Sequence, residues 1–97
     1  MTLPSVPLAV QQALSDTALP ATARLLMWHL ALRLDLLEFR AQKLESLAME
    51  TRTTKQNVSA NLELLLRKGY LDARPGERRG RLYRLPLSRR TTEARAA

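Results

Sequence analysis

The sequence predicts a single, mainly α-helical domain that closes with a small β-hairpin. Three observations support this expectation. Apolar residues recur at helical spacing over several segments, leucine dominates the apolar content while aromatic residues make up only 4%, and a Pro-Gly turn separates two short strand candidates near the C-terminus. A length of 97 residues suits one hydrophobic core.

A short helix is expected to start after Pro7. The segment around it has a narrow apolar stripe at three- and four-residue steps, formed by Leu3, Val6, Val10 and Leu14. Such a stripe packs either on the rest of the domain or on a second copy of the chain. We assign residues 1–18 to an N-terminal helical extension, 19–87 to the main domain and 88–97 to a disordered basic tail that lacks apolar periodicity.

The next helix is predicted from about Pro20 to Leu34, because proline suits a first helical turn, where its missing N–H would have no partner. Its apolar face at helical spacing is formed by Ala23, Leu26, Met27, Leu30 and Leu34. The neighbouring Leu25, Trp28 and Leu32 widen the apolar arc beyond what an exposed helix needs. We therefore expect this helix to be central to the core, with Trp28 packed inside.

A short edge strand from Glu38 to Arg40 is predicted to precede a helix of about two turns, with Phe39 packed in the core or on the hairpin. The helix spans Gln42 to Glu50, and its inward residues are predicted to be Leu44, Leu47 and Ala48.

A break at Thr51 to Thr53 separates this helix from a longer one, predicted from Thr54 to Lys68. Thr54 can cap its first turn, and Gly69 beyond its end can take a left-handed conformation. The inward residues are predicted to be Val58, Leu62, Leu65 and Leu66. Two strands with a basic turn then form a hairpin across which Tyr70 and Tyr83 are expected to pair; the strands are Tyr70 to Arg74 and Arg81 to Leu85.

The charge balance points to a polyanionic partner. Lys and Arg number 16 against 9 Asp and Glu, a formal net charge of +7, and the excess lies in the C-terminal third. The chain has no cysteine, which suits a reducing compartment and excludes disulfides and zinc ribbons. Its richest apolar stretch is too short to cross a bilayer, and its N-terminus lacks a secretory signal, so we expect a cytoplasmic protein that binds no membrane.

The two helices on either side of Thr51 to Thr53 have the arrangement that reading a DNA major groove requires, because the groove admits one helix and the longer helix is polar on one side. Gln and Asn can pair with adenine, Lys with guanine or phosphate, and Thr or Ser with either. Arginines of the hairpin can follow a phosphate strand or enter a minor groove. The residues predicted to bind DNA are Thr53, Thr54, Lys55, Gln56, Asn57, Ser59, Ala60, Asn61, Arg74, Arg78, Arg79 and Arg81.

The stretch TTKQNVSANLELLLRKGYL resembles the recognition helix of winged-helix bacterial regulators such as the MarR and GntR groups, and of phage or plasmid replication initiators. The shared frame is Thr54, Val58, Leu62, Leu65 and Gly69, with Tyr70-Leu71 opening the wing. Upstream, FRAQKLESLAMETRT resembles the first helix and turn of those motifs, although Thr51 stands where such turns often have Gly and Ala60 where many have a basic residue. Over about residues 20–85, the resemblance implies a winged helix-turn-helix, mainly α with a small β-hairpin wing.

These observations predict a sequence-specific, double-stranded DNA-binding transcriptional regulator, in particular a small repressor without an effector domain. A homodimer through the N-terminal helix is expected, because operator-binding proteins are often two-fold dimers. Two alternatives stay open: a replication or partition accessory factor of a mobile element, and a winged helix that docks on an acidic protein, which Ala60 and Glu63 favour. No nucleophile motif, phosphate loop or metal-ligand cluster accompanies His29, so we expect no enzymatic activity, cofactor or metal.

Overall fold

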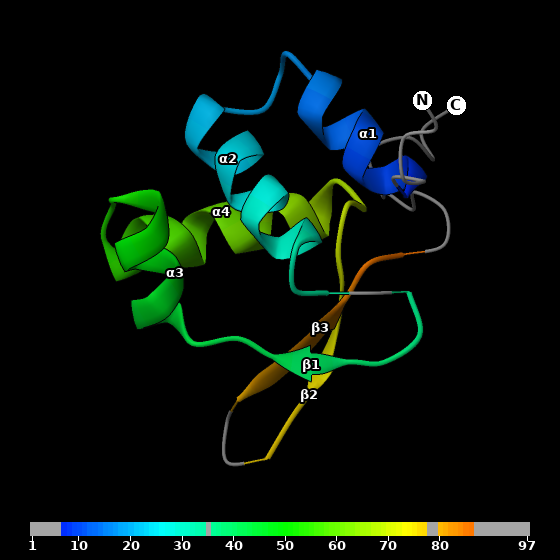
Figure 1. The fold of residues 1–97 in the computed structure, drawn as a ribbon, viewed down its shortest axis with the longest axis vertical. Helices are drawn as coiled ribbons and strands as arrows, with labels where there is room; N and C mark the ends of the chain where they lie inside the picture. The colour runs from blue at the N-terminus through cyan, green and yellow to red at the C-terminus, as the bar shows by residue number, and fades with distance from the viewer. Residues whose placement is uncertain (1–6, 35, 78–79, 87–97) are drawn as a thin grey trace.

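Four helices and a three-stranded antiparallel sheet make up the computed structural model, which describes residues 7–34, 36–77 and 80–86. The helices gather on one side, and the sheet lies beside them with its β2–β3 turn pointing away (Figure 1). In chain order the elements are α1 (Leu8–Ser15), α2 (Ala21–Ala31), β1 (Arg40–Ala41), α3 (Leu44–Thr51), α4 (Lys55–Arg67), β2 (Asp72–Pro75) and β3 (Arg81–Arg84).

Helix α4 is the central element of the core. Its buried residues Val58, Leu62 and Leu65 recur at helical spacing, as predicted, and the helix packs against both α2 and α3. Gly69 ends it with a φ of 82°, so that the N–H of Tyr70 bonds to the Leu65 carbonyl at 2.8 Å. The predicted capping and termination of this helix are therefore confirmed.

The sheet has the order β1-β3-β2, with β3 in the centre. Tyr83 of β3 is paired with Ala73 of β2 on one side and with Arg40 of β1 on the other. The predicted strand near Phe39 is thus present, displaced to Arg40–Ala41, and it adds a third strand to the hairpin. No helix among the described residues is long and apolar enough to cross a membrane.

Helix α1 packs into the same core as the other helices. Val10 and Ala13 are fully buried against α2, and Leu14 is partly buried. Of the two packing alternatives for the N-terminal stripe, its last two residues, Val10 and Leu14, therefore take the one within the chain. Leu3 and Val6, like the tail at 88–97, lie outside the described residues.

Helix α2 differs from the prediction on its outer side. It ends at Ala31 rather than Leu34, and its predicted core face is buried, but Leu25, Trp28 and Leu32 are 43%, 44% and 68% exposed. The expectation that Trp28 packs in the core is wrong, because α1, α3 and α4 leave the side of α2 that carries Trp28 exposed. Leu44 at the start of α3 is likewise exposed rather than turned inward.

Tyr70 has a different partner from the one predicted. It precedes β2 and is fully buried, and its hydroxyl donates to the Asp16 carboxylate at 2.7 Å instead of pairing with Tyr83. Asp16 also accepts the N–H of Ala18 at 2.8 Å, which fixes the connection between α1 and α2. The Asp16 carboxylate thus links the connection between α1 and α2 to Tyr70, which lies just before β2.

We expect Tyr70→Phe to lower the free energy of unfolding by about 1–3 kcal/mol, because it takes the buried hydroxyl donor away from the Asp16 carboxylate. Urea titration of the parent, Tyr70→Phe, Asp16→Ala and the double variant would isolate the pairwise energy as a double-mutant cycle. A Tyr70→Phe protein with the stability of the parent would contradict the assignment.

Candidate nucleic-acid interface

The turn between α3 and α4 is held by a residue in the left-handed conformation. Arg52 has a φ of 55° and a ψ of 49°, and the N–H of the next residue, Thr53, bonds to the Ala48 carbonyl at 2.9 Å. Thr51 is the last residue of α3, and its hydroxyl donates to the Leu47 carbonyl at 2.6 Å. The reversal of the chain thus falls at Arg52, inside the predicted break from Thr51 to Thr53.

The first turn of α4 is fixed by two threonines. Thr54 is the N-cap, and its hydroxyl oxygen accepts the N–H of Asn57 at 3.1 Å. The side-chain amide of Asn57 donates to the Thr53 hydroxyl at 2.8 Å. One amide hydrogen of Asn57 is therefore used inside the turn, and a contact of Asn57 with a base would have to replace or share that bond.

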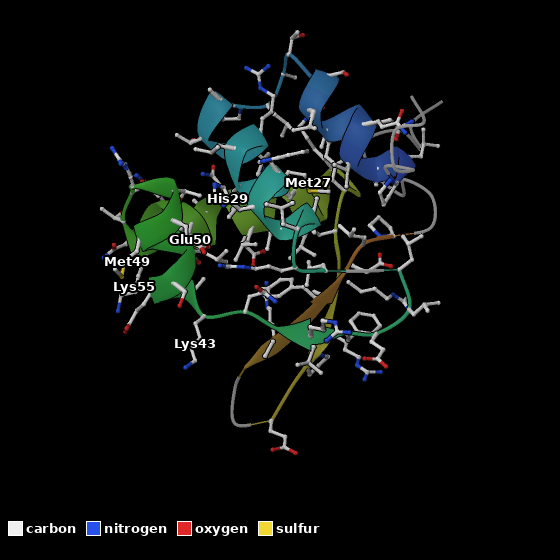
Figure 2. The ribbon with its side chains drawn as sticks, viewed as in Figure 1. Met27, His29, Lys43, Met49, Glu50 and Lys55 are labelled. Carbon is white, nitrogen blue, oxygen red and sulfur yellow. The ribbon has the colours of Figure 1, made fainter. Side chains whose placement is uncertain are left out.

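Beyond the cap, α4 presents a polar side away from the core. Lys55, Gln56, Ser59 and Ala60 are exposed, while Val58 between them is buried. The Lys55 Nζ lies 3.5 Å from the Glu45 Oε1 of α3. Lys55 and Met49 both lie at the end of the molecule where α3 leads into α4 (Figure 2). Because both members of this pair are more than half exposed, the pairing is weak and Lys55 can exchange it for another anion.

Asn61 departs from the predicted set. It is half buried, and its amide donates to the Thr22 hydroxyl in the first turn of α2 at 3.3 Å. This hydrogen bond turns the side chain toward α2 rather than outward with Gln56. The exposed polar side of α4 is therefore concentrated in its first two turns.

Arg81 at the start of β3 forms an ion pair with Glu63 of α4. The hydrogen bond to Glu63, followed by the charge of that carboxylate, raises the pKa of the Arg81 guanidinium above its ordinary value. This pair joins the hairpin to α4 across 18 residues of sequence. Arg81, which is predicted to contact DNA, is thus already paired with the Glu63 carboxylate within the chain.

The other described arginines of the hairpin meet on a single ring. The guanidinium of Arg74 lies 4.5 Å from the centre of the Phe39 ring, and that of Arg84 lies 4.2 Å from it. Arg84 is also 3.4 Å from Asp72 of β2. Phe39 thus lies just before β1 in the sequence, and its ring packs against two arginines of the β2–β3 hairpin.

A cleft of about 310 Å³ separates α4 from β3. Ser59 and Glu63 line it from α4, Arg81 and Tyr83 from β3, and Gln42 from the segment before α3. Its walls present hydroxyl and amide groups together with the ion pair between the Glu63 carboxylate and the Arg81 guanidinium.

The structure brings six of the predicted residues together at the start of α4: Thr53, Thr54, Lys55, Gln56, Asn57 and Ser59. Arg74 and Arg81 lie on the hairpin but on its opposite faces, Arg74 against Phe39 and Arg81 against Glu63 of α4. Arg78 and Arg79 lie outside the described residues. Sequence reasoning missed Arg52, although a basic residue in the short break before a capped helix was a usable signal.

The described part of the chain holds no group of three or more His, Cys, Asp or Glu side chains that could bind a metal ion. No protein-family model, curated protein or solved structure matches the chain.

We expect Arg52→Gly to be about 1 kcal/mol more stable than Arg52→Ala, because glycine takes the left-handed conformation without a Cβ penalty. Both variants remove the same charge, so their difference measures the relief of backbone strain at the turn less the larger entropy that glycine loses on folding. Thermal melts of the two proteins would test this, and equal melting temperatures would show that Arg52 is not held left-handed in solution.

Proposed function

We propose that the chain is a winged helix-turn-helix protein that binds double-stranded DNA in a sequence-specific manner and regulates transcription by occupying its operator. In this proposal α3 and α4 are the helix-turn-helix, α4 enters the major groove, and the β2–β3 hairpin is the wing. The hairpin would contact the backbone or the minor groove beside the site.

The observation that carries the proposal is the construction of the α4 N-terminus. Its core side is locked by Val58 and Leu62, its first turn is capped by Thr54, and Gln56 projects from that turn into solvent. A helix held this rigidly presents its side chains to base edges in a fixed register, which direct readout requires. The N–H groups at a helix N-terminus also favour a phosphate.

The charges near this helix end support contact with a polyanion. Arg52 in the turn and Lys55 in the first turn of α4 are both exposed, and Lys43 lies just before α3. Figure 2 shows both lysines near α3, with Lys43 pointing down from the segment before that helix and Lys55, the first residue of α4, at the left of the view. With a net charge of +7, the chain would be drawn to DNA before any base is read.

One observation favours a second candidate, in which the same surface docks on an acidic protein. Ala60 and Glu63 are exposed on α4 where a DNA-reading helix often carries basic groups, and Glu63 neutralises Arg81 of the hairpin. A carboxylate facing DNA opposes binding unless it accepts from a cytosine amine. Duplex binding by the parent, and its response to substitutions in α4 and the hairpin, separate these two candidates.

We expect Gln56→Ala to weaken binding to a selected operator by about 1–3 kcal/mol and to relax its sequence preference, with little change on random duplex. The operator would first be selected from random genomic fragments, and affinities would be measured by fluorescence anisotropy. Gln11→Ala is the matched control, since it removes the same side chain from the exposed side of α1, away from the predicted DNA-binding residues. Equal weakening on all duplexes would assign Gln56 to the backbone instead.

The basic residues of the hairpin turn, Arg78 and Arg79, should act on all duplexes alike. We expect their double replacement by Ala to reduce the slope of log affinity against log salt by about 0.9 for each phosphate that is no longer neutralised. Arg67→Ala is the control, because it removes an arginine from the opposite end of α4. If neither the hairpin variant nor Gln56→Ala changes duplex binding, the DNA proposal fails and the acidic-protein candidate takes its place.

A further inference from the structure

A single ion pair crosses the groove between α4 and the β2–β3 hairpin. The cleft of about 310 Å³ lies on the side of the pair toward α3, and a second hollow of about 580 Å³ lies on the side toward the hairpin turn. Glu63, Gly80 and Arg81 line both spaces. The pair between the Glu63 carboxylate and the Arg81 guanidinium therefore lies between the two and spans the groove from the helix to the strand.

This ion pair is of the kind that another anion can replace. The side chains of Arg81 and Glu63 are 47% and 55% exposed, and water and salt screen the charges of an exposed pair. Among the described residues that line the two spaces, Glu63 is the only acidic one. An anion that enters the groove thus competes with one carboxylate for Arg81.

The two members of the pair are held differently. Glu63 follows the buried Leu62 on α4, which packs mainly on α2 and α3 and so has a fixed orientation. Arg81 is the first residue of β3, next to the hairpin turn, and β2 and β3 pack mainly on each other. Arg81 can therefore move away with the hairpin, whereas Glu63 stays in place.

We propose that Glu63 stands in for a DNA phosphate on Arg81 in the free chain, and that Arg81 exchanges this carboxylate for a backbone phosphate when the chain binds a duplex. The inference rests on the proposed function. A carboxylate and a phosphate each offer a pair of anionic oxygens to the guanidinium fork, so the fork suits both. Neutralising a DNA phosphate also releases condensed counterions, which favours the exchange at low salt.

The exchange makes Glu63 a residue that limits affinity. Once Arg81 has moved to a phosphate, the Glu63 carboxylate is left without this partner beside a polyanion, and its charge opposes binding. Phosphates carry no sequence information, so the effect is the same on every duplex. An exposed carboxylate on α4 is then compatible with DNA binding, because it has a partner in the free chain.

A different role for the same pair would be that of a clamp, which stays closed and holds the hairpin at a set distance from α4. The two roles predict opposite signs. If Arg81 leaves Glu63 for a phosphate, removing the carboxylate strengthens duplex binding and removing the guanidinium weakens it. If the pair is a clamp, removing either member weakens binding.

The test measures the affinity of the full chain for a random-sequence duplex by fluorescence anisotropy over a series of salt concentrations. Glu63→Gln should tighten binding about two- to fivefold, the worth of an exposed ion pair that no longer has to be broken. Arg81→Ala should weaken binding and reduce the slope of log affinity against log salt by about 0.9, the value for one phosphate. Circular dichroism would verify that each variant is folded.

Two further variants separate the exchange from the loss of a negative charge. Glu77→Gln is the matched control, because it removes the same charge from an exposed residue of the hairpin that lines neither space. It should tighten binding less than Glu63→Gln does. In E63Q/R81A, compared with Arg81→Ala alone, the gain from removing the Glu63 carboxylate should fall to that of the control.

Three results would overturn the inference. A parent that binds no duplex would overturn it together with the proposed function. A parent that binds duplex, with Glu63→Gln no tighter than Glu77→Gln or with an undiminished gain in E63Q/R81A, would overturn the exchange alone and leave the DNA proposal standing. Weaker binding by both Glu63→Gln and Arg81→Ala would make the pair a clamp.

Discussion

The burial of one side of α4 is the constraint on which the rest of the structure depends. Leu62 and Leu65 are almost completely buried between α2 and α3, and replacing such a residue by alanine typically costs several kcal/mol. Because the core fixes the rotation of α4 about its axis, it also fixes which residues face outward. The exposure of Gln56 and Ser59 is thus a consequence of where the leucines are. The same packing limits how far α4 can tilt when its N-terminus meets a partner.

The hairpin is positioned by contacts that are weaker and more exposed than this core. Arg81 and Glu63 are each about half exposed, so their pairing contributes little to stability but sets a preferred position of β3 against α4. Phe39 adds a second contact by packing under Arg74 and Arg84. Helix α4 can therefore keep its orientation in the core while the β2–β3 hairpin changes its position against α4. This division suits a protein that must follow an irregular surface.

The helices were predictable because their signals are local. Periodic leucines, the Thr54 cap and the Gly69 end each depend on residues within about two turns, and they located α4 to within one residue. The core side of α2 was predictable from its apolar spacing, but the exposure of its other side was not. Leu25, Trp28 and Leu32 also recur at helical spacing, and periodicity does not say whether a second apolar side is covered.

The site was predictable in its residue types but not in its partners. The bonds of Asn61 to Thr22 and of Arg81 to Glu63 join residues 39 and 18 positions apart, and sequence spacing carries no information on such pairs. Nor does it show that Arg52 rather than Thr51 takes the left-handed conformation, because either residue would pay only about 1–2 kcal/mol for it and small differences in packing decide between them. Those differences determine which side chains are engaged inside the fold.

The hydrogen bond between Tyr70 and Asp16 spans 54 residues and has a consequence for the order of folding. During synthesis α1 and α2 are made well before Tyr70, so until then their connection has the local hydrogen bond from Ala18 to Asp16 but not the one from Tyr70. Closing so long a loop costs entropy that only the completed core repays. The first two helices of this fold therefore gain their link to the segment before β2 only after Tyr70 has been made, and the side of α2 that packs on α4 lacks that cover until α4 has been synthesised.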